Sequence, residues 1–146
     1  MTEDAKIEND DVIPVTHAMK TKDATVTYLA SIANLGTGVS ITLFLSGVVV
    51  TGNLISGKQY YESIASDIKG SGGESAEIIA KYFSEVGEAV YGLNDEADAP
   101  PTNFIHLNEV SLLKGDGNMF NFSNGLLRVK IEEIDGIIIG RLGNKS

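Results

Sequence analysis

The segment from Val39 to Ile55 constrains the fold most, because it reads as two β-strands joined by a tight turn. From Val39 to Leu45 every second residue is aliphatic, and the residues between them are Ser, Thr and Phe. This alternation is typical of a strand with one buried face. Ser46-Gly47 supplies the turn, since glycine tolerates the positive φ that tight hairpins require. Gly52 allows the second strand to bend. The segment predicts a sharply curved hairpin.

Further strand patterns follow in the C-terminal third of the chain. A third strand begins near Thr102, and its apolar alternation changes phase near Asn108-Glu109, which predicts a β-bulge. A last hairpin is expected from Leu126 to Leu142, with its two-residue turn at Asp135-Gly136. The chain therefore carries at least five strands.

A first helix is expected between Asp23, as its N-cap, and Gly36, just beyond its end. Three poor helix formers, Thr25 to Thr27, leave a strand open as an alternative for its first half. Two more helices are expected at 57–69 and 75–91, separated by a glycine-rich break. The second of these has an apolar stripe with helical period, which we expect to cap the sheet but which is wide enough for an interface. Its members are Ile78, Ile79, Tyr82, Phe83, Val86 and Val90.

This order of elements predicts an α+β fold. We expect a small, strongly bent, five-stranded antiparallel barrel of the Sm-like or SH3-like type, with an N-terminal helix and a two-helix insertion after the second strand, at about 57–91. A plain α+β sheet is the alternative. Residues 21–143 would form this single domain, and the acidic segment 1–20 would be a disordered tail, because it has too few apolar residues to bury.

The composition excludes several classes of protein. The net charge of −9 disfavours nucleic acid as a partner. The absence of cysteine excludes disulfides and thiolate catalysis. No apolar run approaches the roughly 18 residues of a membrane span, and the first residues lack a secretory signal. We therefore expect a cytoplasmic protein without a membrane partner.

A search for catalytic and metal-binding residues yields weak candidates. His106 lies in an apolar strand, where packing is the simpler interpretation; a small hydrolase or ligand-binding domain that uses His106 is the alternative. The acidic stretch Asp95 to Asp98 and the sequence Asp116-Gly117-Asn118 read as solvated loops, because neither has the ligand spacing of an EF-hand. We expect no enzyme activity, no cofactor and no metal.

Three apolar side chains stand out in the otherwise polar loop between 115 and 125. They are Met119, Phe120 and Phe122. Apolar residues in a Gly/Asn-rich loop either form an interaction surface or fold back onto the core. Both alternatives remain open from the sequence, and these three residues are the candidate interaction site.

Four stretches together resemble one family. They are Ser46 to Gly52, Ile55 to Tyr60, Phe104 to Leu107 and Ile134 to Gly140. Their order and spacing, over about residues 24–142, resemble gas vesicle accessory protein U. The resemblance implies a non-enzymatic, cytoplasmic protein at the surface of gas vesicles that influences their formation or clustering. Its expected partners are the shell or other gas vesicle proteins, and further copies of the chain.

An Sm-like RNA-binding module is the remaining alternative that the predicted barrel raises. Sm-like rings use an Arg-containing turn before the last strand to hold RNA. The corresponding turn here, Glu132 to Gly136, is acidic. Together with the negative net charge, this turn argues against RNA binding.

Overall fold

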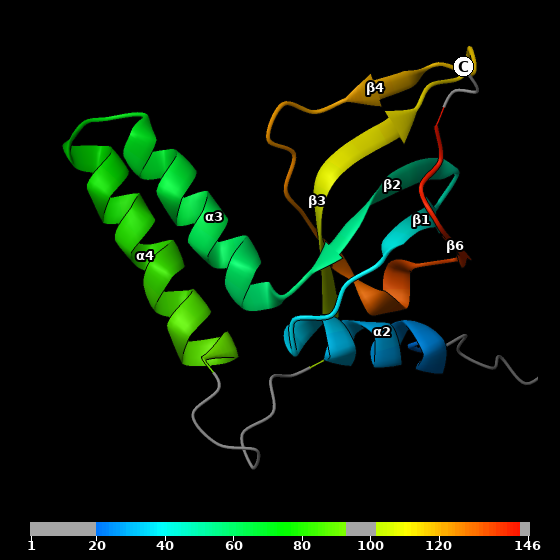
Figure 1. The fold of residues 1–146 in the computed structure, drawn as a ribbon, viewed down its shortest axis with the longest axis horizontal. Coiled ribbons are helices and arrows are strands. Elements are labelled where there is room, and N and C mark those ends of the chain that lie inside the picture. Colours follow the sequence, from blue (N-terminus) through cyan, green and yellow to red (C-terminus); the bar gives the residue numbers. More distant parts are fainter. Residues whose placement is uncertain (1–19, 93–101, 144–146) are drawn as a thin grey trace, which may run out of the picture.

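The computed structural model describes residues 20–92 and 102–143 of the chain. The predicted tail, apart from Lys20, and the acidic stretch that includes Asp95 lie outside these residues. Figure 1 shows a mixed α+β fold, as the sequence predicts. In chain order the elements are α2 (Ala24–Asn34), β1 (Ser40–Leu45), β2 (Val48–Ile55), α3 (Gly57–Gly70), α4 (Glu74–Tyr91), β3 (Phe104–Leu113), β4 (Met119–Asn121), β5 (Leu127–Lys130), the 3₁₀ helix η2 (Ile131–Glu133) and β6 (Gly136–Ile139).

The strands form one antiparallel sheet in the order β4-β3-β2-β1-β6, with β5 also paired to β3. The long β3 strand is shared along its length: its first half pairs with β5 and its last residues with β4. No pairing among the described strands joins β6 to β4 or β5, so the sheet is open. The sheet therefore has six strands rather than the expected five, and closure into an Sm-like barrel is not confirmed.

The predicted β-bulge is confirmed on β3. Thr51 pairs with Ser111 and Asn53 with Asn108, so two β3 residues stand opposite the single residue Gly52. One of the two, Glu109, has a φ of 49°. A side chain at Gly52 would place its Cβ only 2.9 Å from the Asn108 carbonyl oxygen. The bulge bends β3 where the backbone approaches most closely, which explains the glycine.

The expected C-terminal hairpin is wrong. β5 and β6 do not pair with each other; β5 pairs with β3, and β6 with β1. Between them, η2 redirects the chain by a tight turn, and its Ile131 is anchored in the core. Asp135, expected in a two-residue turn, instead ties β6 to the first hairpin. Its N–H donates to the Phe44 carbonyl (2.9 Å), and its carboxylate accepts from the Ser46 N–H (2.7 Å).

The main core lies between the sheet and α2. The Asp23 carboxylate caps α2 by accepting from the Val26 N–H (3.0 Å), so the strand alternative for its first half is wrong. Figure 1 shows α2 lying across one end of the sheet. Buried residues of this core are Val26, Ala30, Ala33, Ile41, Leu43, Val50, Leu54, Ile105, Leu107, Val110, Val129 and Ile131.

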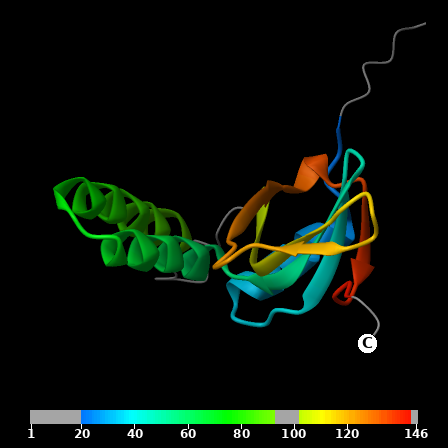
Figure 2. The same cartoon turned by 90° about the horizontal axis from the view of Figure 1, so that it is seen from above.

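Helices α3 and α4 form an antiparallel hairpin that projects away from the sheet (Figures 1 and 2). The face of α4 that is buried carries small residues, Ala76, Ala80 and Gly87, with Tyr91 at its end. At Gly87 an added Cβ would lie 2.7 Å from the Tyr61 Cβ of α3, so glycine permits this approach. The expected capping of the sheet by the apolar stripe is therefore wrong. α4 packs on α3 through its small residues and leaves much of the stripe in solvent.

Candidate functional site

A buried polar cluster joins the helical hairpin to the sheet. Its centre is His106 of β3, which is only 2 % exposed. Its ring contacts Tyr60 and Tyr61 of α3 and Tyr91 of α4, with ring centroids 4.7, 6.3 and 5.4 Å away. Because three tyrosines from both helices meet one strand residue here, we call this group the junction cluster. It fixes the hairpin to the sheet.

Arg128 of β5 completes the junction cluster. Its Nη1 lies 2.9 Å from His106 Nε2 and 3.2 Å from the Tyr91 hydroxyl, and its guanidinium stacks 3.6 Å from the centre of the Phe104 ring. Since arginine can only donate, Nε2 of His106 is the acceptor and the ring proton is on Nδ1. Tyr61, 5.5 Å away, receives a second cation–π contact.

The surroundings of His106 are those of a packing residue. Burial, together with the positive charge of Arg128, lowers the pKa of His106 from 6.5 to about 3. A histidine this weakly basic, with its accepting nitrogen occupied by Arg128, is poorly suited to remove a proton from a substrate. The contacts thus favour the packing interpretation over a hydrolase that uses His106.

The three candidate interaction residues lie on and beside β4, an edge strand. Phe120 and Phe122 are 49 and 44 % exposed, and Met119 is partly exposed. The two rings meet edge to face with their centroids 5.0 Å apart. The Phe122 N–H donates to the Val110 carbonyl (3.1 Å), which holds the segment against β3. These residues, which we call the β4 patch, are arranged as a small apolar surface rather than as part of the main core.

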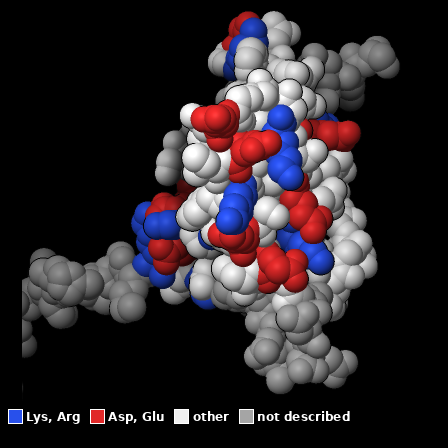
Figure 3. Space-filling model, turned by 90° about the vertical axis from the view of Figure 1, so that its left-hand side faces the viewer, with Lys and Arg blue, Asp and Glu red and all other residues white. Residues whose placement is uncertain are grey.

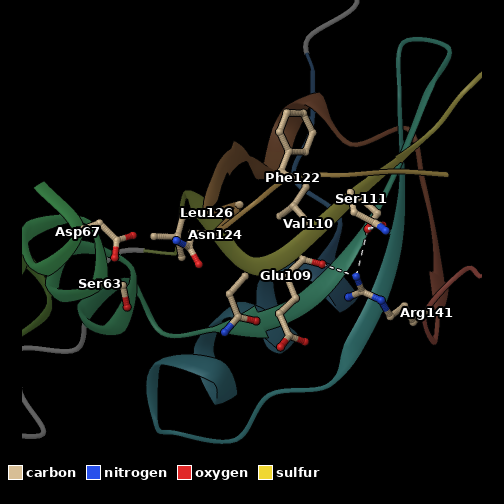
Figure 4. A pocket seen from close by; sticks show the side chains of 12 residues that line it. Ser63, Asp67, Glu109, Val110, Ser111, Phe122, Asn124, Leu126 and Arg141 are labelled. Atoms are coloured by element: carbon tan, nitrogen blue, oxygen red, sulfur yellow. Dashed lines mark hydrogen bonds between the residues drawn. The ribbon is translucent and has the colours of Figure 1, made fainter. Parts of the chain in front are cut away.

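A cleft of about 610 Å³ adjoins the β4 patch. Figure 4 shows it between α3, the β3 bulge and the segment after β4, with Arg141 on the far side. Arg141 donates to the Glu109 carbonyl and to Ser111 Oγ (3.2 Å), so it supports the bulge from outside. The Asn53 amide donates to the Glu109 carboxylate (2.7 Å). Phe122 belongs to both the cleft and the β4 patch.

The residues that line the cleft are not arranged for catalysis by Ser111 or His106. Ser111 Oγ lies 2.5 Å from Asn121 Oδ1 and accepts from Arg141, so no base is positioned to activate it. His106 is not among the cleft residues. The polar groups that line the cleft are mainly carboxylates and amides.

The acidic residues that the structure describes can be placed one by one. Within residues 20–92 and 102–143, no three His, Cys, Asp or Glu side chains are grouped so as to hold a metal ion. Asp116 accepts from the Asn118 N–H (3.0 Å) and lies 3.6 Å from Lys114. These contacts lower the pKa of Asp116, with the Asn118 hydrogen bonds as the main cause, and indicate a loop-stabilising role. The Asp95 to Asp98 stretch lies outside the described residues.

Comparison with known proteins decides the family. A family model described as gas vesicle protein GvpU-like matches residues 23–142, which is most of the chain. The chain belongs to this GvpU-like family. The resemblance based on the four stretches is thereby confirmed. Neither curated proteins nor solved structures give a match to the GvpU-like chain.

Among the helices that the structure describes, none combines the length and apolarity needed to span a bilayer.

Sequence reasoning missed the junction cluster, and it favoured capping of the sheet over an interface for the apolar stripe of α4. Two signals bear on them. The spacing of Ala76, Ala80 and Gly87 along one helix face indicates close helix–helix packing on that face rather than on the stripe. Arg128, a charged residue in a strand opposite an apolar segment, indicates a paired buried polar group. The partners of Arg128 could not be chosen from the sequence, because they lie 22 and 37 residues away in the chain.

Proposed function

We propose that this protein is a non-enzymatic gas vesicle accessory protein that acts in the cytoplasm, at the vesicle surface. It self-associates and binds gas vesicles or their shell proteins, and so influences vesicle formation or clustering. The family match over residues 23–142 is the observation that carries this proposal. The shell or another gas vesicle protein is the partner, and neither nucleic acid nor membrane is involved.

The β4 patch supports a protein contact at a defined place. It combines two exposed aromatic rings with an edge strand, whose unpaired N–H and C=O groups can receive another strand. The adjoining cleft offers hydrogen-bonding groups around this apolar centre. An apolar centre with a polar surround is the usual composition of a specific interface.

A second sheet edge supports self-association. β6 ends the sheet at the side opposite β4, and its Ile138 and Ile139 are exposed. A molecule with an open edge at each end of one sheet can pair with two neighbours. Several copies linked in this way hold many weak shell contacts at once, and the combined attachment is far tighter than one contact alone.

A flotation assay tests the vesicle contact directly. Purified protein is mixed with isolated gas vesicles, and the buoyant layer is assayed for protein and inspected by light microscopy for clusters. Wild-type protein should float with the vesicles. Replacing Met119, Phe120 and Phe122 together by Ser should leave most of the protein below the layer, with little change in Tm, because both rings are exposed.

The matched control is Tyr28→Ser, which removes an exposed aromatic ring from α2 instead. This variant should float like the wild type. Wild-type protein that stays wholly below the vesicles at micromolar concentration would contradict direct binding. A triple variant that unfolds would show that the β4 patch belongs to the core.

A further inference from the structure

The β6 edge of the sheet carries main-chain groups whose directions follow from the pairing with β1. Among the described strands, β6 pairs with β1 alone. The Gly140 N–H donates to the Ser40 carbonyl (2.8 Å), so these two residues form a hydrogen-bonded pair. Such pairs alternate with non-hydrogen-bonded pairs along an antiparallel ladder, so Ile138 is the next residue that bonds to β1. The N–H and C=O groups of Ile137 and Ile139 therefore point away from the sheet.

The surroundings of β6 suit this edge to pairing. β6 and its neighbour β1 contain no charged residue and no proline, the residues that often protect an edge strand. Charged side chains are numerous instead on the helical hairpin, which faces the viewer in Figure 3, and Figures 1 and 2 place β6 on the opposite side of the molecule. After β6 the chain turns back across the sheet, where the Leu142 N–H donates to Thr51 Oγ1 (3.0 Å). Ile138 and Ile139 are 54 and 59 % exposed.

We propose that β6 is the contact through which two copies of the chain pair, antiparallel and about a two-fold axis. This inference rests on the self-association in the proposed function, to which it assigns a place and a register. Ile137 of each copy bonds to Ile139 of the other, because this register uses the outward groups of both residues on both strands. Ile138 of one copy then lies opposite Ile138 of the other, on the axis, with the two Cα atoms about 4.5 Å apart.

The charges at the ends of β6 favour the same orientation. Asp135 lies three residues before Ile138 and Arg141 three residues after it, and both charged residues are exposed. Antiparallel pairing centred on Ile138 brings the acidic end of each strand beside the basic end of the other. Parallel pairing would bring like charges together. Because Asp135 and Arg141 also bond within their own copy, this is an attraction between strand ends rather than an ion pair.

Pairing of β6 with β4 of another copy fits less well. β1 and β3 run in the same direction, since both are antiparallel to β2, so β6 and β4 also run alike. A sheet continued from β6 to β4 with its faces kept is therefore parallel at the junction, and parallel pairs are slightly less stable per residue. The β6 contact is itself small, and each copy carries a charge of −9, so we expect a transient dimer.

Single cysteines test the register, since the chain has no cysteine of its own. Ile138→Cys places two thiols at a Cα separation that a disulfide can bridge. Ile139→Cys is the matched control, because its two Cα atoms in the dimer lie about 8–9 Å apart, too far for a disulfide. Tyr28→Cys, exposed on α2, measures chance collisions. With the purified full chain and diamide as oxidant, the Ile138→Cys variant should cross-link at least about tenfold faster than either control.

A proline tests the outward main-chain groups. Ile139→Pro removes an N–H that points out of the sheet, so the ladder between β6 and β1 is kept. Added to Ile138→Cys, this change should reduce cross-linking to the rate of Tyr28→Cys, with little change in Tm. An Ile139→Pro variant that unfolds would show that this N–H is bonded within the chain, and an undiminished rate would show that the dimer does not use it. Either result contradicts the proposed pairing.

Three further results would overturn the proposal. Equal rates for Ile138→Cys and Tyr28→Cys mean chance collisions, and faster cross-linking of Ile139→Cys means another register. A mixture of Ile138→Cys and Met119→Cys that gives mainly mixed dimers assigns the contact to β6 and β4. Flotation separates this proposal from the vesicle contact. Wild type that stays below the vesicles while Ile138→Cys cross-links contradicts vesicle binding alone, and wild type that floats while Ile138→Cys does not cross-link contradicts the β6 contact alone.

Discussion

The sheet with α2 and the α3–α4 hairpin bury different kinds of side chain. The sheet and α2 enclose large aliphatic residues such as Ile41, Leu43 and Leu107. Between its helices the hairpin buries mainly Ala and Gly, with Tyr61 and Tyr91 at the end near the sheet, while Ile78 and Tyr82 stay in solvent. Aliphatic burial supplies most of the stability of a domain, whereas exposed apolar side chains are available to a partner. The comparison indicates that the sheet with α2 stabilises the fold and that the hairpin presents a surface.

The same substitution in the two regions should give the largest difference. Ile41→Ala removes a side chain with no exposure and should lower the free energy of unfolding by about 2–5 kcal/mol. Ile78→Ala should change it by less than about 0.5 kcal/mol, because that side chain is already hydrated. Urea denaturation of both variants measures this. Similar losses for the two would mean that the stripe is packed in solution and that the comparison fails.

A smaller loss is expected where the two regions meet. Arg128→Ala leaves His106 Nε2 and the Tyr91 hydroxyl without their donor in the junction cluster, and should cost about 2 kcal/mol. Hydrogen exchange should then rise in α3 and α4 more than in β1 and β2, since the hairpin loses its attachment. Lys130→Ala, at an exposed position on the same strand, is the control and should cost little. Uniform exchange throughout the chain would argue against a junction.

The smallest effect is a dependence of stability on pH. His106 has a pKa of about 3 in the folded chain and about 6.5 when unfolded, so between these values the unfolded chain binds more protons. Above about pH 6.5, His106 is neutral in both the folded and the unfolded chain, so its titration does not affect the free energy of unfolding. As the pH falls from 6.5 toward 3, the free energy of unfolding decreases. Between pH 7 and pH 5 the wild type should lose about 1–2 kcal/mol more than His106→Gln. Urea denaturation at the two pH values gives both losses, and parallel losses would show that His106 is not buried neutral.

Local features were predictable from the sequence, because their causes lie within a few residues. Asp23 caps α2, Ser46-Gly47 turns the first hairpin, and the phase change near Asn108 marks the bulge. The three apolar residues of the β4 patch stand out in the sequence, but Met119 and Phe120 lie in strand β4 rather than in the expected loop. Whether they form an interface is a separate question, which the flotation assay addresses.

Features that depend on which elements meet were not predictable. The Asp135-Gly136 signal was read as a hairpin turn, but Asp135 bonds to residues of the first hairpin about 90 residues earlier. The stripe of α4 was assigned to the sheet because helical periodicity shows which side chains share a face and not what covers that face. The small residues that select α3 as the partner of α4 act through close approach, which hydrophobicity alone does not reveal.

The pairing of β1 with β6 has a consequence for how the chain is made. Leu43 of β1 lies opposite Ile137 of β6. This edge of β1 therefore has no partner strand until β6 is translated, about 95 residues later. At ribosomal rates of about 5–20 residues per second, that edge of β1 stays unpaired for roughly 5–20 seconds. Pairing between such distant segments also slows folding after release. During synthesis, the open edge of the first hairpin is thus a place where nascent chains can associate wrongly.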